Sequence, residues 1–438
     1  MDKIEEKIIK IIDDNKEKLI AFARDIYTHA ELGYKEFQTS GKFVKKMEQL
    51  GLRTEKGFAI TGVKAYLNED KKENASLALL GELDALRIPE HAFANPETNA
   101  AHCCGHHAQM AGVFGAALAL TVPEIAEKLD GQVVFFATPA EEYGEIEFKN
   151  QLREQGKIRY GGGKCELLRI GAFDDIDLCL THHIRPGNEI LVGSGTGNGF
   201  VSKVIRVLGK ASHAAGAPEK GVNALSAASL GLQALGLNRE TFRDEDCVRV
   251  HPIITKGGNL VNVIPDEVVV ETLVRGKTIE AFTDAAKKTD RSFKAGAIAM
   301  GAKVEISTLP GYLPTLAEEA LPELKHAAEI SASGIPVIEA SGHAGGSTDV
   351  GDVQHLMPVY TFNTGGVKGG LHQIDFEVTD EEEAYIVTAK MVALAAYGLL
   401  KEKAQRSREL VDQYEPVFKN SAEYVEFMEQ FDSKEIFE

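Results

Sequence analysis

The sequence predicts an α/β fold, with a larger mixed-sheet domain that carries helices on both faces and a smaller inserted α+β domain that is ferredoxin-like. Apolar runs of strand length alternate with helical patterns over residues 1–195, which is typical of a sheet covered by helices. The order then becomes β-α-β-β-α-β over residues 196–308, which is typical of a small domain inserted in a larger one. The 438 residues are enough for two domains.

Each element of the larger domain follows from a local pattern. The chain opens with charged residues between isoleucines at helical spacing, such as Ile4, Ile8 and Ile12, which predicts an amphipathic helix. Later apolar runs have the length of strands, and one run of small residues is typical of a core helix. The expected helices lie at 2–31, 37–50 and 108–120, and the expected strands at 61–67, 77–81, 133–137 and 176–180.

A glycine-dense segment, residues 193–199, separates the two patterns. No Gly-Lys-Ser/Thr follows it, so we interpret it as a hinge and not as a phosphate loop. The inserted domain is expected to contain strands at 201–208, 248–255, 267–275 and 303–308 and helices at 223–235 and 279–300. Strands at 337–339 and 359–362 and a helix at 380–401 follow. The predicted domains are a larger discontinuous domain (1–195 and 309–402), the inserted domain (196–308) and a charged C-terminal tail (403–438).

Composition and charge exclude several classes of protein. The formal net charge of −18 argues against nucleic acid as a partner, because contacts with phosphates would be unfavourable. The five cysteines are odd in number and scattered, which does not suit a disulfide framework. The N-terminal segment has no secretory signal, and the longest nearly apolar stretch, 110–123, is too short to cross a bilayer. We therefore expect a cytoplasmic protein without a membrane partner.

Cys104 and His106 are the first candidate metal ligands. In an extended segment, residues two apart place their side chains on one face, and Gly105 between them permits an unusual backbone path. A helix is expected to begin just after them, and its N-terminus would favour the thiolate of Cys104. The alternative is a buried cysteine beside a hydrogen-bonded histidine.

Adjacent carboxylates, Glu141 and Glu142, follow the apolar run VVFFA. Consecutive side chains diverge, so one can bind a metal ion while the other faces an activated water, the division that metal-assisted hydrolysis needs. Two solvated surface carboxylates are the alternative. His183 also comes after an apolar run, although His182 beside it is a competing candidate, and His372 follows a glycine-rich loop.

At this point the motifs resemble a known family, the metal-dependent aminoacylase/carboxypeptidase family of amidohydrolases. The resemblance is strongest to its branch of indole-acetyl-amino-acid hydrolases, p-aminobenzoyl-glutamate hydrolases and related dipeptidases, and it runs from about residue 20 to 400. Any one motif is weak, but together they are highly specific. They are HAELGYKEF (29–37), GELDAL (81–86), HCCGHH (102–107), TPAEE (138–142), HIRPG (183–187), SHAAGAPEKGVNAL (212–225), GGNLVNVIPDEV (257–268), GGSTDVGDV (345–353) and GGLHQIDFEV (369–378).

The resemblance implies a role for each matching residue. Two divalent ions, Zn²⁺ first with Mn²⁺ or Co²⁺ as alternatives, would be held by Cys104, His106, Glu142, His183 and His372. Glu141 would be the general base, and Asp84 would orient a ligand histidine. From the inserted domain, His213 would polarise the scissile carbonyl, in some dimeric members within the partner subunit's site, while Asn262 and Arg275 would hold the α-carboxylate of an N-acyl amino acid or small dipeptide. The resemblance also implies a homodimer, in which residues 1–195 and 309–402 form the metal-binding catalytic domain and residues 196–308 form the lid and dimerisation domain.

One departure from the family pattern concerns His107, where this branch usually has Asp or Asn. A third donor side chain could add a ligand, change the preferred metal or damage the site. This position keeps a second hypothesis open, a non-catalytic or altered-metal binding protein on the same scaffold. A third hypothesis, a hydrolase with Cys104 as nucleophile and His106 as base, suffers from poor geometry at this spacing.

Overall fold

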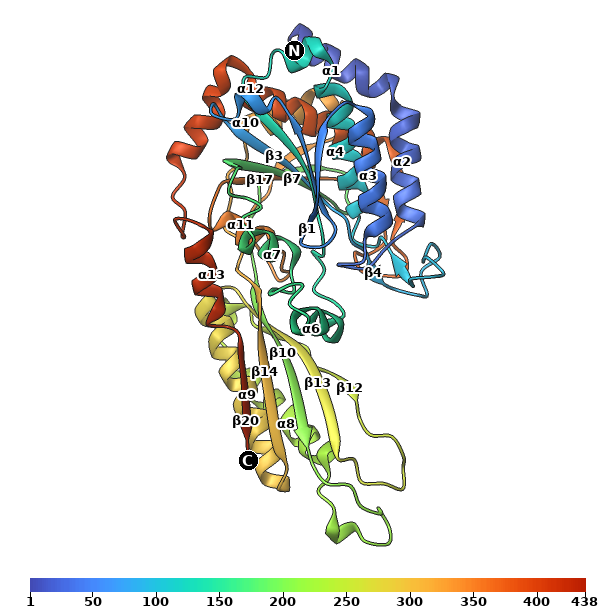
Figure 1. The fold of residues 1–438 in the computed structure, drawn as a ribbon, viewed down its shortest axis with the longest axis vertical. Helices are drawn as coiled ribbons and strands as arrows, with labels where there is room; N and C mark the ends of the chain where they lie inside the picture. The colour runs from blue at the N-terminus through green and yellow to red at the C-terminus, as the bar shows by residue number, and fades with distance from the viewer. The chain divides into compact units, whose positions relative to one another are not determined.

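The computed structural model describes all 438 residues, and the chain divides into two compact units (Figure 1). Unit 1 comprises Met1–Gly195, Leu316–Gly342 and Val353–Ser421. Unit 2 comprises Thr196–Thr315, His343–Asp352 and Ala422–Glu438. The segment expected to form a C-terminal tail, 403–438, is therefore divided between the two units.

Unit 1 is built on a mixed eight-stranded sheet, as the sequence predicts. The strands, in spatial order, are β1 (Arg53–Phe58), β2 (Gly62–Leu67), β6 (Gln132–Thr138), β3 (Ser76–Glu82), β7 (Leu178–Ile184), β17 (Val359–Thr364), β8 (Ile190–Val192) and β15 (Val337–Glu339). The central strands β6, β3, β7 and β17 are mutually parallel. Their carboxyl ends consequently meet at one edge of the sheet, where α/β proteins place their sites.

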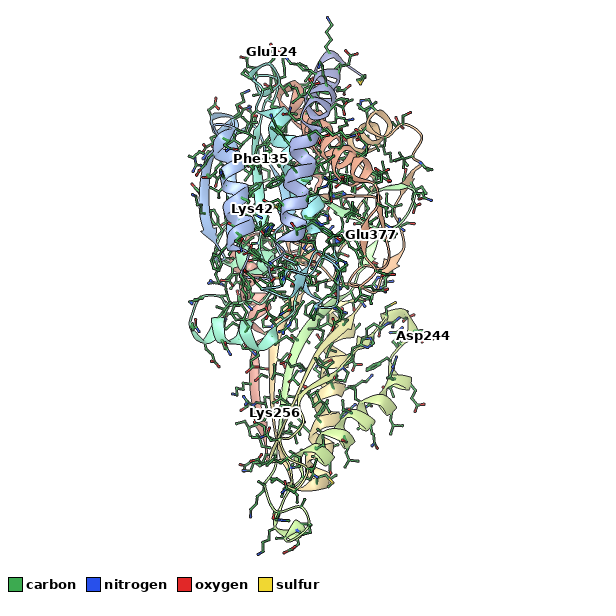
Figure 2. All side chains as sticks on the ribbon, turned by 90° about the vertical axis from the view of Figure 1, so that its right-hand side faces the viewer. Lys42, Glu124, Phe135, Asp244, Lys256 and Glu377 are labelled. Carbon is green, nitrogen blue, oxygen red and sulfur yellow. The ribbon has the colours of Figure 1, made fainter.

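Helices flank this sheet (Figure 1). The helices of unit 1 are α1 (Lys3–Asp14), α2 (Lys16–Thr28), α3 (Phe37–Gln49), α4 (His106–Leu120), α5 (Pro123–Ala126), α6 (Ile146–Glu154), α7 (Gly163–Arg169), α10 (Pro322–Ser331) and α12 (Thr388–Gln413). α4 is buried along almost its whole length and packs against α2, α12 and β3. Small residues make this possible, because a Cβ at Gly115 would lie 2.4 Å from the Ala389 Cβ. Phe135, in the middle of β6, is fully buried inside the unit (Figure 2).

Two helices differ from the expectation. The predicted helix 2–31 is two helices, because the Asn15 side chain donates to the Ile11 carbonyl oxygen at 2.8 Å and ends α1. In its middle α12 is interrupted at Lys401, and the next three residues have positive φ. The stretch Glu382–Gln413 is long and apolar enough to cross a membrane by length and composition, but 89% of its most apolar window is buried, as in a core helix.

Unit 2 contains an antiparallel sheet with α8 (Ala224–Asn238) and α9 (Ile279–Met300) packed on it. The strands are β11 (Arg249–Val250), β12 (Ile253–Lys256), β13 (Glu267–Gly276), β10 (Gly199–Leu208), β14 (Lys303–Tyr312) and β20 (Ser433–Phe437). Along the chain, β10, α8, β11 with β12, β13, α9 and β14 follow the β-α-β-β-α-β order that was expected of a ferredoxin-like domain. One predicted strand, 248–255, is two short strands on β13, since Pro252 between them has no N–H for the ladder; Lys256 ends the second (Figure 2).

The remaining elements are short. They are β4 (Leu86–Arg87), β5 (Ala100–Ala101), β9 (Thr196–Gly197), β16 (His343–Ala344), β18 (Val367–Lys368), β19 (Glu377–Val378), α11 (Val350–Gln354) and α13 (Ser421–Glu429). The strands among them form three two-stranded pairs, β4 with β5, β9 with β16 and β18 with β19. A π-helical turn, Glu382–Val387, directly precedes α12.

Candidate metal centre

Cys104 lies one residue before the N-cap of α4, and His106 is the first residue of that helix. Gly105 between them has φ of +88°, and a Cβ there would lie 2.0 Å from the Ile184 Cγ2. Only glycine fits this tight left-handed turn. The turn places the Cys104 Sγ 3.3 Å from the His183 Nε2 and 3.3 Å from the His372 Nε2.

The donors form two groups that share Cys104. One group is Cys104, His106 and His183, and the other is Cys104, Glu142 and His372; the ligand atoms of each lie within 4.8 Å of one another. In the second group the His372 Nε2 is 3.0 Å from the Glu142 Oε1. Tetrahedral ligands bound to one zinc-sized ion at 2.0–2.3 Å are about 3.3–3.8 Å apart. The structure therefore brings all five sequence-predicted donors together as two adjacent positions that meet at one thiol.

The two histidines of the first group are oriented by hydrogen bonds from their Nδ1 atoms. The His106 Nδ1 is 2.9 Å from the Asp84 carbonyl oxygen and 3.3 Å from the Asp84 Oδ1. The His183 Nδ1 is 2.8 Å from the Ile184 carbonyl oxygen. These contacts leave the Nε2 atoms facing the other donors, which is how protein frameworks present imidazole to a metal. Asp84 also binds the second group, because its Oδ2 accepts from the Glu142 backbone N–H at 2.9 Å.

The residues of this centre fit two divalent metal ions. Three buried atoms of the centre have no partner in hydrogen-bonding geometry, namely the His106 Nε2, the Asp84 Oδ1 and the Glu142 Oε1. Polar atoms of neighbouring side chains lie 3.0–3.3 Å from each of them. Burial, together with the charge of Glu142, raises the pKa of the Cys104 thiol. The N-terminus of α4 lies beside Cys104, as expected, but burial dominates, and a bound cation would supply the positive charge that favours the thiolate.

Glu141 and Glu142 diverge, as expected of consecutive residues. Glu142 faces Cys104 and His372, whereas the Glu141 Oε2 lies 4.0 Å from the His106 Nε2. Only 8% of Glu141 is exposed. Neither side chain is a solvated surface carboxylate, because the turn after β6 directs both into the centre.

A buried ion pair beside His106 was missed in the sequence. The Lys164 Nζ donates to the Glu82 Oε1 at 2.5 Å, and the Gln109 side chain donates to the Glu82 Oε2 at 2.7 Å. The Glu82 Oε2 lies 3.0 Å from the His106 Nε2. Burial would raise the pKa of Glu82, but Lys164 and His106 hold it at about 2. The available signal was GELDAL, in which Glu82 ends β3 two residues before Asp84.

His183, and not His182, belongs to the centre. Both lie inside β7, which continues to Ile184 and does not end before them as expected. Alternation along the strand turns His182 the other way, where its Nε2 lies 2.8 Å from the Thr364 Oγ1 and its ring 4.8 Å from that of Phe362. The neighbouring histidine is therefore a packed core residue.

His107 also turns away from the donors. Its Nε2 lies 3.2 Å from the Tyr385 hydroxyl, and its ring lies 4.6 Å from that of Tyr27 and 5.4 Å from that of His102. Burial, with the charge of His106, lowers the pKa of His107 to about 3. The side chain that replaces the usual Asp or Asn is thus a neutral member of an aromatic cluster and not an added ligand.

The three predicted residues of the lid lie in unit 2, at opposite ends of its sheet. His213 pairs with Val263, and the Asn262 carbonyl oxygen accepts from the Ala214 N–H at 3.0 Å, so His213 and Asn262 are neighbours. Arg275 lies at the other end of β13, over the Phe200 ring at 5.8 Å. The eight residue steps from Glu267 to Arg275 span about 26 Å of strand. Within one chain, Asn262 and Arg275 are too far apart to bind the same carboxylate.

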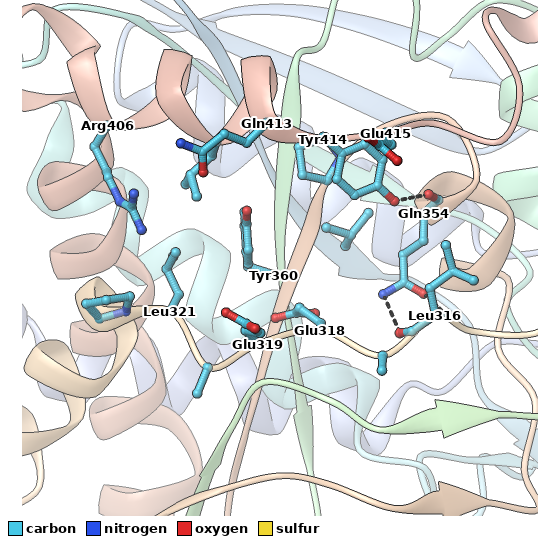
Figure 3. A pocket seen from close by; sticks show the side chains of 16 residues that line it. Leu316, Glu318, Glu319, Leu321, Gln354, Tyr360, Arg406, Gln413, Tyr414 and Glu415 are labelled. Carbon is cyan, nitrogen blue, oxygen red and sulfur yellow. Dashed lines mark hydrogen bonds between the residues drawn. The ribbon is translucent and has the colours of Figure 1, made fainter.

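A separate pocket of about 370 Å³ in unit 1 contains none of the predicted site residues (Figure 3). Leu316, Glu318, Tyr360, Arg406 and Tyr414 are among the residues that line it. Burial raises the pKa of Glu318 to about 8, although its carboxylate accepts from the Thr361 backbone N–H at 2.8 Å. The residues that line the pocket include neither cysteine nor histidine and none of the predicted donors, so it does not carry the metal centre.

Comparisons with known proteins agree with this geometry. A family model described as Peptidase family M20/M25/M40 matches residues 78–397. Xaa-Arg dipeptidase of Mus musculus is 27% identical over 406 residues, which cover 90% of this chain and 85% of the relative. A p-aminobenzoyl-glutamate hydrolase chain of Escherichia coli (strain K12) is 27% identical over 314 residues, which cover 69% of this chain and 60% of the relative.

Solved structures show the same fold. A Bacillus subtilis protein described as a dinuclear metal-binding peptidase from the M20 family has a TM-score of 0.60 at 24% identity, covering 88% of this chain and 98% of that chain. The family resemblance drawn from the motifs is confirmed. Since the family match spans well over half of the 438 residues and includes every donor from Cys104 to His372, the chain belongs to peptidase family M20/M25/M40 and is a metallo-amidohydrolase.

Proposed function

We propose that the protein hydrolyses the amide bond of N-acyl amino acids or small dipeptides that have a free α-carboxylate. The observation that carries this proposal is the pair of donor groups sharing Cys104, with the spare carboxylate of Glu141 beside them. The two named relatives cleave a dipeptide and an aminobenzoyl-glutamate, as their names state, and both substrates are amides of an amino acid.

The chain's own residues supply the proton transfers. Glu141 takes a proton from the attacking water and later delivers it to the leaving amine nitrogen, the two roles of one general acid–base group. Bound divalent ions would polarise the scissile carbonyl and make the water a stronger acid. Asp84 fixes both the His106 ring and the Glu142 backbone, so the donors keep their places during the reaction.

Zn²⁺ is the metal that we propose, since a thiol and imidazoles are ligands that suit it, while the carboxylates admit Mn²⁺ or Co²⁺. We also propose a cytoplasmic homodimer. The dimer is supported by the separation of Asn262 from Arg275, because two copies could bring one residue from each to a substrate. It is also supported by exposed apolar residues near β12, namely Ile253, Ile254, Leu260, Val261 and Val263.

A hydrolysis screen tests the substrate class. Metal-free protein would be loaded with Zn²⁺, Mn²⁺ or Co²⁺ and offered dipeptides, N-acetyl and aromatic-acyl amino acids and p-aminobenzoyl-glutamate, each beside its α-amide. We expect free acids to be cleaved, amides to be poor substrates, and a chelator to abolish turnover until metal is restored. Equal rates on acids and amides would contradict the carboxylate requirement, and chelator-resistant turnover would contradict the metal mechanism.

The cysteine-nucleophile alternative has little support. The Cys104 Sγ lies between two histidine nitrogens at 3.3 Å, as a shared ligand would. Its raised pKa also makes it a poor nucleophile, since the thiolate is the reactive form. The non-catalytic alternative was based on His107. This residue contacts Tyr385 and Tyr27 and none of the metal donors, so the main support for that alternative is removed.

A further inference from the structure

The turn that carries both active-site glutamates contains a strained residue. Ala140, between β6 and Glu141, has φ of +48°, in the left-handed region that a residue with a Cβ rarely adopts. Such a conformation persists only where the surroundings enforce it, and it is often found at functional sites. What enforces it here therefore bears on where Glu141 points.

A buried carboxylate holds this peptide. The Ala140 N–H donates to the Glu36 Oε1 at 2.8 Å, and the Thr61 hydroxyl donates to the Glu36 Oε2 at 2.7 Å. Glu36 is 0% exposed and lies 104 residues from Ala140 in the sequence. Neither hydrogen bond reaches a donor of the metal centre, so the hydrogen-bonded connection of Glu36 to the centre runs through the Ala140 backbone. Burial, together with the nearby charge of Asp84, raises the pKa of Glu36 to about 7.

The other neighbours of the turn restrict it without replacing that hydrogen bond. The Ala140 carbonyl oxygen accepts from the Gly163 N–H at 3.0 Å. A Cβ at Gly33 would lie 3.1 Å from the Ala140 Cα, and one at Gly163 would lie 1.6 Å from the Pro139 oxygen. The turn is thus packed on two sides by glycines, while Glu36 is the acceptor for the amide that the left-handed conformation turns inward.

We propose that Glu36 is a positioning residue, whose carboxylate fixes the left-handed Ala140 peptide and so directs Glu141 toward the reacting amide and Glu142 toward the metal. This inference rests on the proposed role of Glu141. It assigns a function to the second glutamate of HAELGYKEF, a motif that the metal chemistry leaves unexplained. Asp84 holds the far side of the same turn through the Glu142 N–H, so one carboxylate fixes each end.

The test compares four variants as metal-loaded enzymes. Glu36→Ala leaves the buried Ala140 N–H without its acceptor, and we expect kcat to fall about 10- to 100-fold, the cost of a small misplacement at a catalytic group, with KM and metal content unchanged. Glu36→Gln keeps an acceptor oxygen and should retain most of the turnover. Ala140→Gly alone should leave kcat near wild type, since glycine adopts this φ freely.

The double variant Glu36→Ala/Ala140→Gly is the decisive case. Glycine removes the steric cost of the left-handed turn, so it should recover several-fold of the kcat lost in Glu36→Ala. Wild-type kcat in Glu36→Ala, or a double variant no better than the single one, would overturn the proposal. Should Glu36→Ala fail to fold, Thr61→Val, which removes only the second partner of Glu36, must still lower kcat without lowering metal content; an unchanged kcat would also overturn it.

A matched control separates positioning from general stability. Glu31 is also buried and accepts from the Thr39 N–H at 2.8 Å, but its side chain does not contact the turn. Glu31→Ala, the same change as Glu36→Ala, should lower the unfolding temperature and leave kcat per metal-loaded enzyme unchanged. Failure of the proposed function would appear differently, as wild-type turnover in Glu141→Gln, whereas a loss in that variant with none in Glu36→Ala refutes only the positioning role.

Discussion

At the scale of single residues, neighbours in the sequence have opposite environments. Glu141 and Glu142 diverge toward different parts of one centre, His183 joins it while His182 packs against Phe362, and His106 joins it while His107 does not. In β7 the cause is alternation of side chains along a strand. At α4 it is the 100° turn between successive helical residues. Pairs of this kind allow chemistry and packing to be tested separately.

Glu141→Gln removes the proton acceptor and keeps the shape of the side chain. We expect the turnover rate to fall about 10²–10⁴-fold, the usual contribution of a general base. Two metal ions per chain should remain bound, as measured by elemental analysis of the purified protein. Glu142→Gln is the matched comparison: it should lower metal content together with activity, because that carboxylate faces Cys104 and His372. Wild-type turnover in Glu141→Gln would refute the mechanism.

His107→Asn restores the residue type that is usual in this branch of the family. Since His107 contacts Tyr27, His102 and Tyr385 and no donor, metal content and turnover should stay at wild-type values. The smaller side chain leaves a gap in the aromatic cluster, so the free energy of unfolding should fall by about 1–3 kcal/mol in chemical denaturation. A changed metal preference in this variant would show that His107 does influence the centre.

Residues whose side-chain chemistry is itself informative could be predicted from the sequence. Cysteine, histidine and paired glutamates at the ends of apolar runs predicted five donors that the structure brings together. Sequence reasoning missed Glu82, Lys164 and Glu36, whose roles depend on partners 82 and 104 residues away. In a sequence, a carboxylate that is buried and paired looks the same as a carboxylate on the surface, because its partner is distant in the chain. No local pattern could therefore distinguish the two.

At the scale of elements, accuracy follows the strength of the end signals. The helix predicted at 279–300 has the same bounds in the structure, because Thr278 caps its N-terminus and Gly301 ends it with φ of +68°. The helix predicted at 2–31 lacked a visible stop, since Asn15 ends α1 through a side-chain bond that propensity alone does not reveal. β20 was missed because five mostly polar residues form a strand only against β14.

β20 protects an edge of the lid sheet. It pairs with β14 over five residues, and Lys294 lies 3.3 Å above the Phe437 ring. Deleting residues 433–438 should therefore lower the unfolding temperature and increase aggregation on heating, because an unpaired β14 edge offers free N–H and C=O groups to other chains. Circular dichroism measures the unfolding temperature during a thermal ramp, and static light scattering measures the aggregation. A deletion variant that unfolds and scatters like wild type would show that this strand adds no protection.

At the scale of the whole molecule, the discontinuous organisation was visible in advance only in part. The glycine-dense segment 193–199 marked where the element order changes, and the two units do meet in sequence between Gly195 and Thr196. No local pattern indicated that 343–352 and 422–438 return to the lid unit. These returns depend on long-range pairing, such as the Tyr424 hydroxyl that donates to the Asp352 Oδ1 at 2.8 Å.

The positions of His213, Asn262 and Arg275 connect the oligomeric state of the protein with its catalytic activity. His213 and Asn262 lie at one end of the unit 2 sheet and Arg275 at the other, so we expect the first pair to serve the active site of a partner subunit. Glu141→Gln and His213→Ala should each be nearly inactive as homodimers. After the two are unfolded and refolded together, random pairing makes half of the dimers mixed. Each mixed twofold dimer has one site with both native residues, so activity should return to about a quarter of wild type.

Val261→Asp, which charges a fully exposed apolar residue beside Asn262, should weaken dimerisation in sedimentation and prevent this recovery. No recovery on mixing, from variants that are each inactive and dimeric, would place His213 in the site of its own chain.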